Sequence, residues 1–211
     1  GAHENSNELR RIIQEKIDAV EKNGGYDAIL LGFGLCGNST AGITARSIPL
    51  VIPRAHDCCT IFLGSKHKFM EHFKDNLSSE WSSAGYMERG DKDSYLRESD
   101  TGKLLGLDKA YQEYVEQYGE ENARYIWETL HPKNENSELI YIKIPETEHL
   151  GYLQKLEAYA GEIGKTVKVL DGDMRLIRDL VNGEWNQEDF LVVPPGETIK
   201  PVYDYDIIIT C

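Results

Sequence analysis

The chain has 211 residues, of which 40% are hydrophobic and 9% aromatic, and its formal net charge at pH 7 is −13. This length suits one α/β domain or two small lobes with a sizeable core, and we expect a single domain over residues 1–211. The negative charge argues against a nucleic acid or an anionic membrane as partner, and no apolar run approaches the roughly 20 residues of a membrane span.

Strands and helices alternate in the first third of the chain. Apolar spacing predicts a helix over Glu8–Glu21, and short apolar runs predict strands over Tyr26–Leu31, buried on both faces, and Ile48–Ile52. Asp57 is placed to cap a helix that begins at Cys58, and a further helix is expected over Ser65–Asn76. The two strands are expected to be neighbouring, parallel and central.

The segment 77–107 lacks a sustained period and is rich in polar residues, so we expect an insertion or a lid-like loop. Helices and strands alternate again after it. Helices are expected over 108–118, 120–130, 149–163 and 174–181, and strands over 138–144, 166–170, 190–193 and 205–210. This order predicts an α/β fold with three layers, a mostly parallel sheet and helices on both faces; the two halves could be similar lobes.

A glycine-rich turn follows the first strand. Gly32, Gly34 and Gly37 form a G-x-G-x-x-G pattern that ends at Asn38. A dinucleotide site needs a long helix directly after the third glycine, and the sequence here does not predict one, so NAD is not the expected ligand. Two other interpretations stay open: a turn that lets backbones pack closely, or a turn that presents Cys36 and free backbone N–H groups to a ligand.

Three cysteines lie near predicted strand ends, and parallel strands deliver such positions to one edge of a sheet. Cys36 follows the first strand, Cys58 follows the second, and Cys211 ends the last; His56 lies two residues before Cys58. Thiolates with an imidazole suit zinc or an iron–sulfur cluster. We therefore predict a metal site of these four residues, although buried unliganded cysteines would give the same pattern, as expected for Cys59.

Two other uses of this polar cluster stay open. Cys36 or Cys58 with His56 could form a nucleophile and its base. Arg54 and Asp57 lie at the same predicted edge, where the arginine could hold a phosphate or a carboxylate over the glycine turn. The cysteine count and the adjacent pair do not resemble a secreted disulfide framework, and they fit a cytoplasmic location.

Four segments carry a resemblance to a known family. The segments Leu31–Asn38, Pro49–Cys58 and Leu63–Ser65, with Phe190–Gly196 near the end, are similar to the signatures of domain-of-unknown-function family DUF1638. The resemblance implies a setting in anaerobes and methanogens, near corrinoid-dependent methyltransferases. It also implies an N-terminal strand that ends in a cysteine, which this chain lacks at its start, so the third thiol is either Cys211 or a missing one.

The leading interpretation is a metal or iron–sulfur protein accessory to corrinoid or one-carbon metabolism. The alternatives are a protein that binds a small phosphate or carboxylate ligand without a metal, and a structural accessory subunit. A small molecule, a corrinoid protein and a second copy of the chain are the partners that the sequence leaves open.

Overall fold

The computed structural model describes residues 6–74, 81–88, 111–130, 138–162, 164–202 and 204–211. The chain divides into two compact units: unit 1 is Gly1–Ser79, Ile144–Glu146 and Leu170–Cys211, and unit 2 is Glu80–Lys143 and Thr147–Val169. Mixed helices and strands agree with the expected α/β class. The single domain expected over residues 1–211 stays a prediction.

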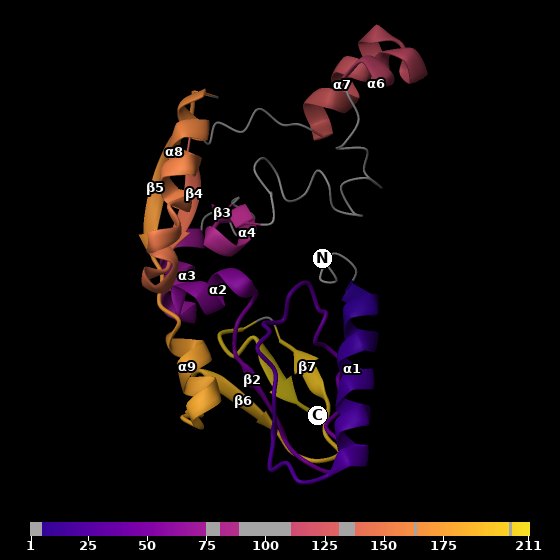
Figure 1. Cartoon of the computed structure of the whole chain (residues 1–211). Helices are drawn as coiled ribbons and strands as arrows, with labels where there is room; N and C mark the ends of the chain where they lie inside the picture. Colours follow the sequence, from indigo (N-terminus) through magenta and orange to yellow (C-terminus); the bar gives the residue numbers. More distant parts are fainter. Residues whose placement is uncertain (1–5, 75–80, 89–110, 131–137, 163, 203) are drawn as a thin grey trace. The chain divides into compact units, whose positions relative to one another are not determined.

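Unit 1 contains a three-stranded sheet in the order β1-β2-β6 (Figure 1). Strand β1 (Ile29–Leu30) pairs in parallel with β2 (Leu50–Pro53), and β6 (Phe190–Val193) pairs with β2 in the antiparallel direction. The parallel pairing of the first two strands confirms that prediction, whereas β6 departs from the expected parallel direction. β2 is central and fully buried, but β1 is the edge of the sheet and Leu30 is 38% exposed, so β1 is not buried on both faces.

The two faces of β2 pack against different helices. Leu50 and Ile52 share a hydrophobic cluster with Leu9, Ile13 and Ile17 of helix α1 (Ser6–Asn23). The intervening Val51 shares another cluster with apolar residues of helix α9 (Arg175–Asn182), because neighbouring side chains of a strand point to opposite faces. The members from α9 are Leu176 and Leu180. The cluster with α1 also takes in an antiparallel hairpin of β7 (Ile199–Pro201) and β8 (Ile208–Thr210), of which β7 was not predicted.

Two short helices follow β2, and local caps fix their ends. Asp57 caps α2 (Cys58–Leu63) as predicted, because its carboxylate accepts a hydrogen bond of 3.2 Å from the Thr60 amide. Gly64, with φ of 73°, ends α2 in the left-handed region. Ser65 then caps α3 (Lys66–Phe73) by accepting from the amides of the second and third helical residues. The caps at Asp57, Gly64 and Ser65 therefore set the chain direction after β2.

Unit 2 has a sheet in the order β3-β4-β5, in which β3 (Trp81–Ser82) pairs in parallel with β4 (Glu138–Lys143). The other helices of this unit are α4 (Ala84–Glu88), α6 (Tyr111–Tyr118), α7 (Glu120–Leu130) and α8 (Tyr152–Glu162). Strand β5 (Thr166–Asp171) begins in unit 2, and its last two residues belong to unit 1. A 3-10 helix, η2 (Pro145–Leu150), spans the boundary of the units. Where one helix was expected over 149–163, Gly151 with φ of 68° separates η2 from α8.

Only part of the expected insertion or lid at 77–107 lies within the described residues. Residues 81–88 form β3 and α4, and the remainder lies outside the described residues. Its role as a covering segment therefore stays a prediction. Among the described helices, none is long and apolar enough to cross a membrane.

Candidate functional site

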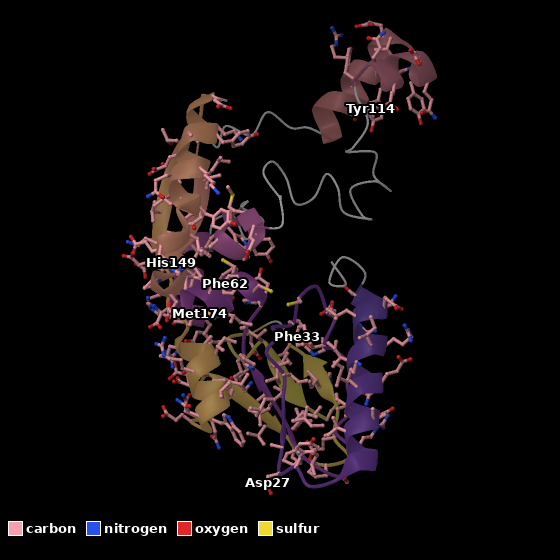
Figure 2. The ribbon with its side chains drawn as sticks, in the orientation of Figure 1. Asp27, Phe33, Phe62, Tyr114, His149 and Met174 are labelled. Carbon is pink, nitrogen blue, oxygen red and sulfur yellow. The ribbon has the colours of Figure 1, made fainter. Side chains whose placement is uncertain are left out.

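The loop after β1 continues alongside the chain that leaves β2. Directly after β1, the Leu31 amide donates to the Val51 carbonyl over 2.8 Å. Farther along the loop, Leu35 donates to the Ala55 carbonyl and Cys36 donates to the His56 carbonyl, each over 2.8 Å. The side chains of Phe33 and Leu35 pack against the core of unit 1 and anchor the loop. Phe33 is labelled in Figure 2. The glycine-rich segment is thus held by backbone pairing that brings it to the start of α2.

Gly34 is the glycine that this close approach requires. A Cβ atom at this position would lie 2.8 Å from the Ala55 carbonyl oxygen, 2.9 Å from the Asp57 amide nitrogen and 3.0 Å from the Asp57 Cα. All three atoms belong to backbone, so no side-chain rotation can relieve the contact. At Gly32, by contrast, a Cβ would meet nothing within 4 Å. The geometry supports the interpretation of a turn for close backbone packing.

The turn itself is left-handed over three residues, with φ of 46° at Cys36, 61° at Gly37 and 67° at Asn38. Its carbonyl groups are tied to α1. Ser6 Oγ donates to the Gly37 carbonyl over 2.8 Å, and Arg10 donates to the Asn38 carbonyl over 2.6 Å. Residues 36–42 form turns, and the long helix that a dinucleotide fingerprint requires does not follow Gly37.

Two buried hydroxyl groups close this turn from inside. Ser39 Oγ donates to the Cys36 carbonyl over 2.7 Å, and Thr40 Oγ1 donates to the Gly34 carbonyl over 3.2 Å. Both side chains are fully buried. This role was not predicted from the sequence, although serine and threonine directly after glycine and asparagine are typical of such turns.

The loop brings the thiols of Cys36 and Cys58 together. Both side chains are partly exposed, and neither forms a disulfide. The hydrogen bond with the Cys58 thiol is the largest cause that raises the pKa of Cys36, and burial raises this pKa further. The pair therefore resists losing both protons unless a cation compensates the second negative charge.

Cys59 and Asp57 have structural positions beside this pair. Cys59 is fully buried, and burial raises the pKa of its thiol, which agrees with the core role expected for it. Burial also raises the pKa of the Asp57 carboxyl, whose hydrogen bonds with the first turn of α2 oppose that shift. The Asp57 carboxylate is occupied as a helix cap.

His56 lies between β2 and α2 but turns toward α3. Its ring centroid lies 5.4 Å from that of Phe69 in a tilted arrangement. The imidazole is half-buried, and this burial lowers its pKa, which favours the neutral form that a metal ligand needs. The structure does not place His56 in a three-residue metal-binding group with the two cysteines.

Arg54 is used by the fold. Its guanidinium donates to the carbonyls of Gln187 (3.0 Å), Phe190 (3.3 Å), Asp206 (3.1 Å) and Ile208. The side chain is 13% exposed, and it lies 3.7 Å from the Asp206 carboxylate. These contacts tie β2 to the loop before β6 and to the start of β8, so the geometry favours a structural role over the binding of an anion.

Cys211 lies elsewhere in unit 1. The first residue of β8 accepts a hydrogen bond from Arg54, and the strand then runs on to Cys211, whose backbone pairs with Thr198 over 2.9 and 3.0 Å. Figure 1 places this end of the chain beside β7, away from α2. The expectation of one shared edge rested on a parallel last strand, whereas β8 forms an antiparallel hairpin with β7.

Of the four predicted ligands, the structure therefore brings two together. Across residues 6–74, 81–88, 111–130, 138–162, 164–202 and 204–211, no group of three His, Cys, Asp or Glu side chains is arranged to hold a metal ion. The two predicted ligands that the structure brings together are both thiols.

A second feature missed in the sequence is the buried Lys66 in the first turn of α3. This residue is 4% exposed, its ammonium group lies 3.8 Å from the centroid of the Tyr205 ring, and it donates to the Tyr205 carbonyl over 3.3 Å. Burial is the largest cause that lowers the pKa of Lys66, and the charge of Arg54 lowers it further. A lysine at a helix start gives no sequence signal of burial, because this position is ordinarily exposed.

The fold and the paired thiols define an α/β protein with a candidate cysteine site beside a parallel strand pair. The family of proteins of unknown function DUF1638 matches residues 1–181, which is most of the chain, and the chain belongs to this family. The matched residues include the whole site but end before 190–196, so the similarity of that segment stays a resemblance. No curated protein and no solved structure matches the chain.

Proposed function

We propose that this protein binds a soft metal ion through the thiolates of Cys36 and Cys58, as an accessory of corrinoid or one-carbon metabolism. The observation that carries the proposal is the contact of two partly exposed thiols from segments 22 positions apart in the chain. A backbone that must exclude a Cβ atom at Gly34 holds these two segments together.

The chemistry of the pair supports a single ion with open coordination positions. Thiolates prefer zinc and other soft ions, and a cation compensates the second negative charge that the neighbouring thiols otherwise avoid. Structural zinc sites are closed by about four protein ligands, whereas catalytic and transfer sites keep positions open. Two protein thiolates therefore favour zinc that receives further ligands from a substrate or a partner over an iron–sulfur cluster, which needs more cysteines.

His56 stays in the proposed ligand set. Its neutral ring lies in the segment that separates β2 from Cys58, but it would have to leave Phe69 to reach the ion. We expect His56→Ala to weaken zinc binding by about tenfold if the ring moves, as is usual when one supporting group of a metal site is lost. An unchanged affinity would remove His56 from the set and leave the thiol pair.

The metabolic setting rests on the family resemblance. A zinc ion with open positions can bind an exogenous thiol, lower its pKa and make it a better methyl acceptor. A corrinoid protein is the partner that fits such a reaction. A cytoplasmic location fits reduced thiols. We also propose a three-layer fold, which is supported by the packing of α1 and α9 residues against opposite faces of β2.

The decisive experiment measures metal content. The full chain is purified without oxygen, loaded with zinc or with cobalt(II) as a spectroscopic substitute, and freed of excess metal. We expect one ion per chain and a thiolate-to-cobalt charge-transfer band. Cys36→Ser with Cys58→Ser should abolish both signals and keep the circular dichroism spectrum.

Cys211→Ser is the matched control, because it also removes a thiol from unit 1 but lies beside Thr198. It should retain the metal and the band. Metal uptake that survives in the double variant, or that is lost in the Cys211 variant alone, would contradict the proposed site.

A further inference from the structure

We infer that Cys36 and Cys58 form a reversible disulfide bond by exchange with a low-molecular-weight disulfide such as glutathione disulfide. The inference rests on the same pair of thiols as the proposed metal site but does not require a metal. Because a disulfide sulfur is no longer a thiolate, the bonded form excludes the metal-bound form of the proposed function.

The first support is the way in which the backbone fixes both cysteines. The Cys36 amide is hydrogen-bonded to the His56 carbonyl, only two residues before Cys58 in the chain. Cys58 is the first residue of α2, whose start is fixed by the Asp57 cap. A disulfide needs two Cα atoms within about 4.4–6.8 Å and Cβ atoms that approach each other. The hydrogen bond between the Cys36 and Cys58 thiols brings the two side chains together.

The second support is selective access. Cys36 and Cys58 are both partly exposed, so a small disulfide can reach them, whereas Cys59 is fully buried. Cys211 is exposed but lies beside Thr198 at the end of β8. Cys58 and Cys59 are adjacent on one helix, where successive side chains point in different directions. The structure therefore selects one pair from the four cysteines.

The conformation of Cys36 adds a third argument. A left-handed φ of 46° is unusual for a residue with a side chain, and it occurs at a turn rather than in a regular element. A turn residue can adjust its torsion angles to the geometry of the S–S bond, while Cys58 stays in register with α2. Oxidation should therefore leave the sheet and the helices unchanged.

The exchange proceeds in two steps that balance. A thiolate of the pair attacks one sulfur of glutathione disulfide, which forms a protein–glutathione disulfide and expels one glutathione thiolate. The second thiolate of the pair then attacks the protein sulfur of that mixed disulfide and expels the second glutathione. The two protein thiols lose two protons and two electrons, and the electrons reduce one glutathione disulfide to two glutathione thiols.

The test uses the full, metal-free chain. It is incubated anaerobically with excess glutathione disulfide, then quenched by acid and an alkylating reagent, and analysed by intact mass and peptide mapping. We expect a product that carries two fewer alkyl groups than the fully reduced chain, does not carry glutathione, and links the peptides of Cys36 and Cys58. Reduction with dithiothreitol should restore both thiols.

Single variants separate a real pair from two independent thiols. In Cys36→Ser and in Cys58→Ser, the remaining cysteine should stop at the mixed disulfide with glutathione, because its partner is absent. Cys211→Ser should still form the internal bond. Stable glutathione adducts on the wild-type pair, unreacted thiols, or a bond that involves Cys59 or Cys211 would overturn the inference.

A second measurement distinguishes this inference from the proposed function. Wild-type protein loaded with one equivalent of zinc should oxidise at least tenfold more slowly than the metal-free chain if the ion occupies the same two sulfurs. Equal rates with formation of the Cys36–Cys58 bond would support the disulfide and count against the metal site. If the metal-free chain never makes the Cys36–Cys58 bond although the chain binds one zinc ion, the result would support the metal site and overturn the disulfide.

Discussion

Replacement of Gly34 by alanine tests the close backbone approach on which the whole site depends. The new Cβ atom would meet three backbone atoms of Ala55 and Asp57 at 2.8–3.0 Å, so one of the two segments must move. Movement weakens the hydrogen bonds from Leu35 to Ala55 and from Cys36 to His56. Two such bonds contribute about 2 kcal/mol in total, and the overpacking itself costs about 1–3 kcal/mol.

We therefore expect Gly34→Ala to lower the free energy of unfolding by about 2–4 kcal/mol, which corresponds to a fall in Tm of about 5–15 °C for a chain of this size. Amide hydrogen exchange at Leu35 and Cys36 should accelerate, because these two amides are the donors of the affected bonds. Zinc affinity should fall at least tenfold as Cys36 moves away from Cys58.

Gly32→Ala is the matched control in the same glycine-rich segment, because a Cβ at that position meets nothing within 4 Å. It should change the stability by less than about 1 kcal/mol and preserve zinc binding. Equal effects of the two substitutions would refute the close approach, and with it the argument that the backbone holds the two thiols together.

Three further predictions concern the residues around the pair. Arg54→Met should cost about 3 kcal/mol in urea unfolding, because a largely buried side chain is shortened and several backbone carbonyls lose a charged donor. Arg46→Met should cost less than about 1 kcal/mol, since Arg46 is 44% exposed and pairs with Asp18. Similar costs would contradict the structural role of Arg54. Cys36→Gly should change the free energy of unfolding by no more than about 1 kcal/mol, because glycine relieves the strain of the left-handed backbone and so offsets the lost side-chain contacts. The same substitution should abolish zinc uptake, and retained uptake would exclude Cys36 as a ligand. Because the pKa of Cys36 is raised, zinc must displace a proton from this thiol when it binds. A chelator-competition assay should therefore find that the affinity for zinc rises with pH, by up to tenfold per pH unit for each displaced proton. An affinity that does not change with pH would argue against thiolate ligands.

Local sequence signals predicted the part of the fold that carries the thiol pair. The apolar run before Pro53 identified β2, and the aspartate at 57 identified the start of α2. Short-range rules of this kind work because a cap or a strand end is decided by a few neighbouring residues. The parallel pairing of β1 with β2 also followed, because consecutive strands joined by a crossover usually lie side by side.

The direction of the later strands could not be read in the same way. The apolar pattern of Ile207–Thr210 indicates a strand but carries no information about which partner it pairs with. The signal for the hairpin was nevertheless present, because Asp204 and Asp206 are turn-forming residues that lie between β7 and β8. Its omission led directly to the placement of Cys211 at the wrong edge.

The position of Cys36 is a reason to regard the thiol pair as more than two buried cysteines. The turn places three consecutive residues in the left-handed region, and Gly37 and Asn38 are residue types that tolerate it. A cysteine there costs about 1–2 kcal/mol of backbone strain relative to glycine. If packing were its role, a fully buried position such as that of Cys59 would provide it without this cost. Cys36, the residue with the strained backbone, is also the one whose thiol is hydrogen-bonded to Cys58. Backbone strain of this kind is concentrated at functional sites.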